Sequence, residues 1–425
     1  MRTRWRVAAL TLALVGSTFG TLGHAGGAGG PPTVDGRAVF DAAAQVLRTH
    51  YAGPAMGEIE ARLAAQRRAL LGRCAAAPCP LALGRAAVEA VVWSLDDPHT
   101  GVNWDAPALA QGAQQVTARR VWSGMLTDLR TPSTLQVVHV DHGGPAERAG
   151  LRPGDVVLAV NRRDDMAEAG LRASFLEEAE ADQKPYVLRV RRGEQVLTVT
   201  VIPASWPAFA QPSLRWRGQV AVISVPNFVP GTGPAFNTLV TRAAAQGAAG
   251  LVVDLRWNGG GSAVDCLAAA QSLAGDRVNL VGVGRSGRPL PAWRTTPEAQ
   301  AARARVRTPW VGPLALLVSA RTASCGELLA YFGQRAGGMV VGQPTRGLMS
   351  SGTRAHDLPG GGLLFVSDVR PTLDGRVRLP GRVVPDCLLP DDAELSSQGR
   401  DTALEEALRV ARGTKNCAGP RGSGR

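Results

Sequence analysis

The sequence of 425 residues predicts an α/β fold: a mixed sheet covered by helices, with an N-terminal helical region and an inserted domain of short strands. Three observations predict this class. From about Leu214 onward, strand-like and helix-like segments alternate, which is typical of a largely parallel sheet with helical connections. Residues 34–93 space their apolar side chains as helices do. Residues 116–203 contain short apolar or alternating runs with turns between them.

The first 25 residues are expected to be a signal peptide. Three arginines among the first six residues precede an apolar run from Val7 to Val15, and residues 23–25 resemble a small-residue cleavage site. The run is shorter than a bilayer-spanning helix needs, although an uncleaved anchor stays open as an alternative. The sequence therefore predicts an exported protein, periplasmic or extracellular, with no stable membrane span after cleavage.

The remaining chain is expected to divide into four segments. They are a helical region (34–112), a domain of short strands (116–204), an α/β core (213–395) and a C-terminal helix with a basic tail (396–425). The formal net charge of +12 is almost all arginine. Because no basic run is interleaved with aromatic residues, we expect no nucleic-acid partner. No spacing of cysteine and histidine resembles a zinc site, and no cofactor is expected.

Six cysteines in an exported chain permit disulfides. The pairings considered are Cys74 with Cys79, Cys387 with Cys417, and Cys266 with Cys325. The first would close a short loop and the second would tie down the C-terminal tail. The third pair could equally be two small buried residues, because spacing alone does not fix connectivity.

One stretch, Pro313 to Gly347, carries the main functional signal. The apolar run Leu314 to Val318 has the length of a buried strand, and a polar turn leads to Ser324, where a helical pattern begins. A serine at the start of a helix lies beside free backbone N–H groups and the positive end of the helix dipole. Two interpretations of Ser324 are open: a helix N-cap, or a nucleophile whose neighbouring N–H groups stabilise an oxyanion.

A second strand–turn–helix unit strengthens the catalytic interpretation. After the strand Leu251 to Leu255, three successive glycines, 259 to 261, let the backbone approach a ligand closely. Their N–H groups could complete an oxyanion hole. One unit thus offers a hydroxyl, and the other offers amides that no side chain covers.

The segments "VVDLRWNGGG", "TASCGELLA", "VVGQPTRG" and "GRVVPD" occur in this order. They resemble the catalytic core of the C-terminal processing (tail-specific) serine peptidases, which are related to the tricorn core protease. The resemblance extends from about Phe40 to Asp386 and implies a crotonase-like catalytic core. By position, Ser324 matches the nucleophile of that family. The N–H of Cys325 and that of Gly259 or Gly260 match its oxyanion hole.

The same resemblance suggests a histidine base. Relatives with a Ser–His arrangement are similar to this chain at the Asp-x-His-Thr segment, where His99 would be the base. Relatives with a Ser–Lys dyad carry lysine where this chain has Leu348, and leucine cannot activate a serine, so that dyad is excluded here. His356, beside Asp357, is a weaker candidate base and more simply a residue at a strand edge.

The orienting acid of the Ser–His relatives is also replaced. Its matching position lies near Leu379, which cannot orient an imidazole. Asp97 and Asp374 are the candidate substitutes. Because a triad without its acid keeps part of its activity, the replacement weakens the triad hypothesis more than the reaction class.

The segment "GGPAERAGLRPGDVVLAVN" strongly resembles the PDZ signature. Such domains add an extended peptide to a sheet edge and hold its terminal carboxylate on backbone N–H groups. The residues expected to bind that carboxylate are Ser123, Gly124, Met125 and Leu126. An alternative is a domain kept only as a structural lid.

Together these features predict an exported serine endopeptidase that captures proteins or peptides by their C-terminus. Ser324 would attack the scissile carbonyl and His99 would accept the proton. The rival hypothesis is a catalytically silent peptide-binding protein on the same fold, in which Ser324 is only a cap.

Overall fold

The computed structural model describes residues 34–417, apart from 75–77, 107–118, 164–167, 306–307, 391, 393–394, 397 and 399. The expected signal peptide and the end of the basic tail lie outside the described residues. Among the helices of the described part, none is both long enough and apolar enough to cross a membrane.

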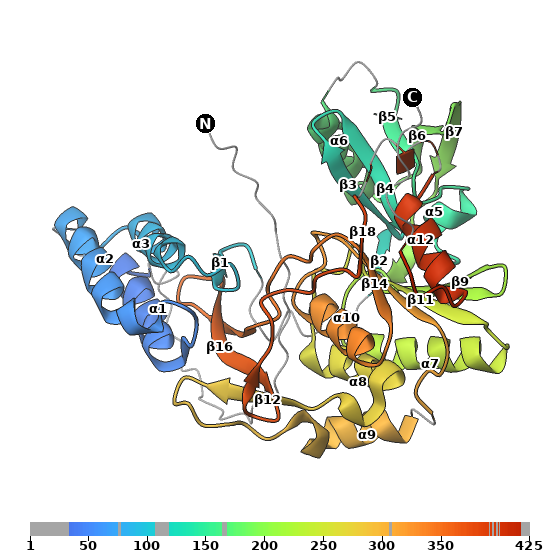
Figure 1. Ribbon diagram of the computed structural model, residues 1–425. Coiled ribbons are helices and arrows are strands. Elements are labelled where there is room, and N and C mark those ends of the chain that lie inside the picture. Colours follow the sequence, from blue (N-terminus) through green and yellow to red (C-terminus); the bar gives the residue numbers. More distant parts are fainter. Residues whose placement is uncertain are drawn as a thin grey trace, which may run out of the picture.

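The N-terminal region is a three-helix unit, as predicted. Its helices are α1 (Gly36–His50), α2 (Ile59–Arg73) and α3 (Leu81–Ser94). Helices α1 and α3 meet at two glycines, since a Cβ on Gly84 would lie 2.1 Å from the carbonyl oxygen of Gly36. Apolar side chains of all three helices form a core with Leu364 and Val366 of a distant strand. This unit lies to one side of the rest of the molecule (Figure 1).

The α/β core contains a six-stranded sheet in the order β18-β14-β13-β11-β10-β9. Its strands are β9 (Ser213–Arg217), β10 (Val220–Ser224), β11 (Gly250–Asp254), β13 (Leu314–Val318), β14 (Met339–Gly342) and β18 (Cys387–Leu388). Only β9 pairs antiparallel; every other neighbouring pair is parallel. The predicted α/β alternation is therefore confirmed.

Helices cover both faces of this sheet. Along β13, Leu314, Leu316 and Val318 belong to the larger apolar cluster, while Ala315 and Leu317 belong to a smaller one with the C-terminal helix. Alternate side chains of a strand face opposite sides, so β13 is buried on both faces. The helices are α7 (Thr232–Ala245), α8 (Ala263–Ala274), α9 (Pro297–Arg305), α10 (Cys325–Arg335) and α12 (Thr402–Ala411).

A second, five-stranded sheet was not foreseen, since the sequence predicted one mixed sheet. It is built around the long strand β16 (Leu363–Leu373), which pairs with the other four. They are β1 (Gly101–Asn103), β12 (Leu280–Gly284), β15 (Gly352–Asp357) and β17 (Val377–Arg378). Strand β1 follows the helical region directly, so this sheet connects that region to the core (Figure 1).

The inserted domain is an antiparallel sheet in the order β3-β4-β5-β6-β7 with two helices. Its elements are β3 (Met125–Thr131), β4 (Thr134–Val140), α5 (Pro145–Arg148), β5 (Val156–Val160), α6 (Ala169–Ala181), β6 (Tyr186–Arg192) and β7 (Gln195–Val201). A ribbon of β2 (Arg119–Trp122) and β8 (Ala204–Pro207) brackets the domain in the sequence.

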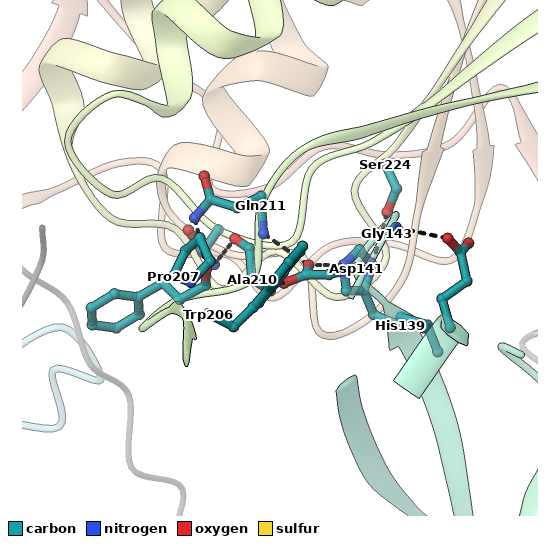
Figure 2. Close-up of polar contacts among 12 residues, drawn as sticks. His139, Asp141, Gly143, Trp206, Pro207, Ala210, Gln211 and Ser224 are labelled. Atoms are coloured by element: carbon teal, nitrogen blue, oxygen red, sulfur yellow. Dashed lines mark hydrogen bonds and ion pairs between the residues drawn. The ribbon is translucent and has the colours of Figure 1, made fainter. Parts of the chain in front are cut away.

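The junction between the inserted domain and the core is polar and centred on Asp141. Its carboxylate accepts hydrogen bonds from the Trp206 indole N–H at 2.9 Å and the Gln211 backbone N–H at 2.9 Å (Figure 2). His139 contacts the same carboxylate through Nε2 at 3.0 Å and reaches Ser224 of β10 through Nδ1 at 3.4 Å. The inserted domain is therefore joined to the six-stranded sheet by a partly buried hydrogen-bond network.

Two of the three cysteine pairings considered are disulfides, Cys74–Cys79 and Cys387–Cys417. Cys266 and Cys325 are unbonded and buried, with their sulfur atoms 2.7 Å apart. Burial is the largest cause that raises the pKa of the Cys266 thiol, and the neighbouring Cys325 sulfur is the next. The Cys266 thiol therefore stays protonated near neutral pH.

Thiol titration of the denatured protein, purified from an oxidising compartment, is expected to find two thiols if Cys266 and Cys325 stay reduced and none if they pair. The reduced protein is the control and should give six. Six thiols without prior reduction would contradict both disulfides.

Candidate active site

Ser324 lies between strand β13 and helix α10 with an unusual backbone conformation, φ 51° and ψ −116°. Positive φ is uncommon for a side chain other than glycine and costs on the order of 1–3 kcal/mol. Ser262, at the corresponding start of α8, offers a comparison within the same chain. It has ordinary cap angles, φ −61° and ψ 119°, and its side chain accepts the Asp265 N–H. Ser324 is therefore held in a conformation that capping alone does not require.

A buried carboxylate, Glu327, holds the serine turn in place. It forms a capping box with Ser324, whose N–H donates to Oε2 at 2.8 Å. The same oxygen accepts the Leu348 N–H at 2.7 Å. The other oxygen accepts the Gly347 N–H and the Thr345 hydroxyl, at 2.8 and 2.5 Å. One carboxylate thus fixes both the strained serine and the loop from Thr345 to Leu348.

The glycine turn after β11 lies against the serine turn. Ala323 N–H donates to the Asn258 carbonyl at 2.9 Å, and Thr322 Oγ1 donates to the Leu255 carbonyl at 2.8 Å. Gly260 has φ +107°, and a Cβ there would lie 2.8 Å from the Cβ of Ser324. Only glycine therefore permits this approach of the backbone to Ser324.

The predicted oxyanion donors are not equivalent. The Gly260 N–H donates to the Asn258 side-chain oxygen at 2.9 Å, so it is already used within the turn. Gly259 is exposed, and nothing lies within 4 Å of the position that a Cβ would take there. Cys325 is the first residue of α10, where an N–H has no partner inside the helix. The geometry favours Gly259 and Cys325 as the donor pair.

His99 lies in a buried turn just before β1, and its side chain points toward the loop that follows Leu348. Its Nδ1 lies 2.7 Å from the hydroxyl of Ser351. Its Nε2 is buried and has no hydrogen-bond partner among the described residues. The structure therefore leaves one imidazole nitrogen oriented and the other unused, and it forms no hydrogen bond between Ser324 and His99.

Burial lowers the pKa of His99 to about 4, because desolvation penalises the charged imidazolium. The charge of Asp97 opposes this shift, and that of Arg346 adds to it. The imidazole is therefore neutral at pH 7, which is the state that a general base requires.

The two candidate orienting acids occupy very different places. Asp97 accepts the backbone N–H of His99 at 3.1 Å and the Thr100 hydroxyl at 2.8 Å, so it shapes the turn rather than binding the imidazole ring. Asp374 follows β16 and is exposed. The Thr100 hydroxyl accepts the N–H of Ser367, so Ser367 lies close to the turn that holds His99. Asp374 follows Ser367 by seven residues of extended chain, a separation of over 20 Å at about 3.3 Å per residue. That distance excludes Asp374 as the orienting group of His99.

His356 is on β15, opposite Leu364 of β16, and its ring lies 4.7 Å from that of His50. Burial, then the nearby charges of His50 and Arg354, lower the pKa of His356 to about 4. His356 follows Ser351 by five residues of extended chain, a separation of about 15 Å. His356 therefore packs against the N-terminal helices, away from the Ser351 hydroxyl that contacts His99.

Two residues of this site, Glu327 and Ser351, were not predicted from the sequence. Glu327 carries a detectable signal, since serine followed three residues later by glutamate is the capping-box pattern. Ser351 has none, because its contact with His99 joins positions 252 residues apart. Leu379 is buried in the core, and its side chain has no polar group that could orient an imidazole.

The expected carboxylate loop of the inserted domain lies at the start of edge strand β3, and it is closed. Ser123 is fully buried, Gly124 and Met125 are buried, and only Leu126 is partly exposed. Further along β3, Asp128 accepts two hydrogen bonds from the Arg321 guanidinium, from Nε at 3.1 Å and from Nη2 at 2.6 Å. Arg321 belongs to the polar turn that leads to Ser324. Arg321 also lies over the ring of Trp257, beside the glycine turn, at 5.3 Å.

Comparison with protein families identifies two parts of the chain. Residues 219–375 match peptidase family S41, and residues 136–164 match the PDZ domain. The chain is 29% identical over 288 residues to the chloroplastic C-terminal processing peptidase of Tetradesmus obliquus, which covers 61% of this chain and 58% of that protein. It is 40% identical over 81 residues to the mitochondrial serine protease HTRA2 of Bos taurus, 17% of that protein. The chain thus spans little more than half of the length of the first of these relatives.

Solved structures share the fold. The photosystem II D1 C-terminal processing protease superposes with a TM-score of 0.51 at 20% identity, covering 89% of this chain and 97% of that one. A putative S41 protease from Bacteroides fragilis gives 0.56 at 16% identity, covering 75% and 87%. These likenesses show that the chain shares its overall fold with the two solved proteases.

Proposed function

We propose, from the premise that this chain is a homologue of the C-terminal processing peptidases with a peptidase family S41 core and a PDZ domain, that it is an exported serine endopeptidase. It would cleave proteins or peptides captured through the PDZ domain. The N-terminal pattern supports export, and two disulfides suit an oxidising compartment.

The observation that carries this proposal is the strained backbone of Ser324. Its positive φ is maintained by the buried Glu327 carboxylate and by a glycine turn that only glycine can form. Strain of this kind persists where the surrounding structure enforces it, and it is concentrated at functional sites. Ser262, the ordinary N-cap of helix α8, shows that a cap in this fold needs no such strain.

The reaction follows from the roles of these groups. The Ser324 oxygen attacks the scissile carbonyl carbon, and its proton passes to the neutral Nε2 of His99. The oxyanion that forms is stabilised by the N–H groups of Gly259 and Cys325. His99 then returns the proton to the leaving amine, and water hydrolyses the acyl-enzyme by the same steps. Substrate binding must first bring Ser324 and His99 together.

In this proposal Ser351 takes the place of the missing acid. Its hydroxyl lies at Nδ1 of His99 and holds the ring so that Nε2 is available. The unpartnered Nε2 costs on the order of 1–3 kcal/mol while it stays buried. A hydrogen bond to Ser324 in the substrate complex would recover that energy, which favours closure of the pair.

Labelling with a fluorophosphonate tests the proposal. We expect a covalent adduct on Ser324, located by peptide mass mapping, because the probe needs an activated serine and an oxyanion hole. The Ser324→Ala variant is the control and should remain unlabelled. A folded wild-type protein that takes no label would support the rival function, a silent peptide-binding protein.

A further inference from the structure

Glu180, near the end of helix α6, occupies the expected peptide-carboxylate loop. Its Oε2 accepts the backbone N–H of Ser123 at 3.0 Å, and its Oε1 accepts the Tyr186 hydroxyl at 2.6 Å. Burial raises the pKa of Tyr186, and the charge of Glu180 raises it further, so the phenol remains a donor. An internal carboxylate therefore already binds one of the N–H groups that a ligand carboxylate would use.

The surroundings close this loop from another side. A Cβ on Gly124, which has φ +72°, would lie 3.2 Å from the Trp206 ring, and the Trp206 indole is fixed by Asp141 (Figure 2). The Ser123 hydroxyl is buried and lies beside the Tyr186 phenol. A ligand group that displaced Glu180 would thus meet the N–H and the hydroxyl of the same residue.

We propose that Glu180 is a specificity-determining residue of the PDZ domain: its carboxylate takes the place of a ligand's terminal carboxylate at Ser123 and lowers the affinity for free C-termini. The inference rests on the proposed function of this domain in substrate capture. Two carboxylates cannot share the site, because like charges in contact repel and one N–H cannot satisfy both. Segments without a charged end, such as internal stretches of a chain, avoid this competition.

Two neighbouring groups hold the Glu180 carboxylate in its position at the loop. Tyr186 holds one oxygen of Glu180, and the charge of Arg120 interacts favourably with the same carboxylate. Arg120 itself lies over Trp122, 4.2 Å from the ring. Glu180 is therefore placed by two groups outside the peptide loop and does not depend on a ligand for its position.

The test compares peptides that differ only at their end. An array of octapeptides with varied last three residues, each made with a free carboxylate and as the amide, is probed with the full-length protein carrying Ser324→Ala to prevent cleavage. We expect the wild-type PDZ domain to bind amides at least as well as acids. Glu180→Gln should raise acid binding by about tenfold or more and change amide binding much less. Glutamine keeps an acceptor for the Ser123 N–H, so the fold is preserved.

Glu177→Gln is the matched control, since Glu177 is an exposed residue of the same helix and loses the same charge. It should leave both affinities as in the wild type. Tyr186→Phe keeps the charge of Glu180 but removes its anchor, and it should raise acid binding by less than Glu180→Gln does. The proposal is overturned if Glu180→Gln leaves acid binding unchanged or lower, or raises acid and amide binding equally. Fluorophosphonate labelling with Ser324 intact is independent of these results, so failure here and failure of the peptidase function are told apart.

Discussion

Ser324→Ala is expected to abolish peptidase activity, with a loss in kcat on the order of 10⁴ or more, because it removes the only atom that forms the acyl-enzyme. The helix should survive, since the Ser324 N–H still donates to Glu327 and the capping hydroxyl contributes only about 1 kcal/mol. Hydrolysis of an unfolded protein substrate, followed together with the thermal unfolding midpoint, measures both quantities. Activity within tenfold of wild type would refute the nucleophile.

Ser262→Ala provides the control for this experiment. Ser262 begins α8 as Ser324 begins α10, but its side chain accepts the Asp265 N–H in ordinary cap geometry. Its removal should cost about 1 kcal/mol of unfolding free energy and leave most of the activity. The two serines thus separate the capping role from the catalytic role within one chain.

The strand–turn–helix units were predictable because local patterns specify them. A strand buried on both faces reads as an uninterrupted apolar run, as in β13, and three glycines mark a turn that side chains cannot form. The three-helix region and the inserted sheet were likewise visible as changes in period. Element positions therefore followed from the sequence even where their ends shifted by a few residues.

The contacts between distant segments were not predictable. The second sheet depends on β16 pairing with β1, about 260 residues earlier in the chain, and short strands such as β1 carry little pattern of their own. The contact of Ser351 with His99, and that of Glu180 with Ser123, join residues whose types are common on any surface. Their roles come from tertiary placement, which a single sequence does not encode locally.

Burial also changes the pH dependence expected of a histidine base. An unperturbed imidazole titrates near about 6.5, so a surface histidine base would make kcat/KM rise with pH through that region. Desolvation lowers the pKa of His99 to about 4. We therefore expect kcat/KM to be nearly constant from about pH 6 to 8 and to fall as the pH drops through about 4, where the base becomes protonated.

The same shift affects stability, and the two effects must be separated. Below about pH 6.5 the unfolded chain binds a proton at His99 that the folded chain excludes until about pH 4, so the free energy of unfolding decreases as the pH falls across that window. His356 adds a decrease of the same sign, since burial lowers its pKa likewise to about 4. Circular dichroism recorded beside each rate identifies the pH below which activity is lost by unfolding.

Because both histidines titrate in the same range, the pH profile cannot assign the base, and variants must. His99→Ala is expected to lower kcat/KM by on the order of 10³ or more, since Ser324 then has no proton acceptor. His356→Ala should cost little, because its ring packs on His50 and lies away from the Ser351 hydroxyl that contacts His99. Ser351→Ala should give an intermediate loss, since Nδ1 of His99 would lose its only hydrogen-bond partner among the described residues. A larger loss in His356→Ala than in His99→Ala would move the base to His356, and full activity in both would direct the search to the carboxylate of Asp97.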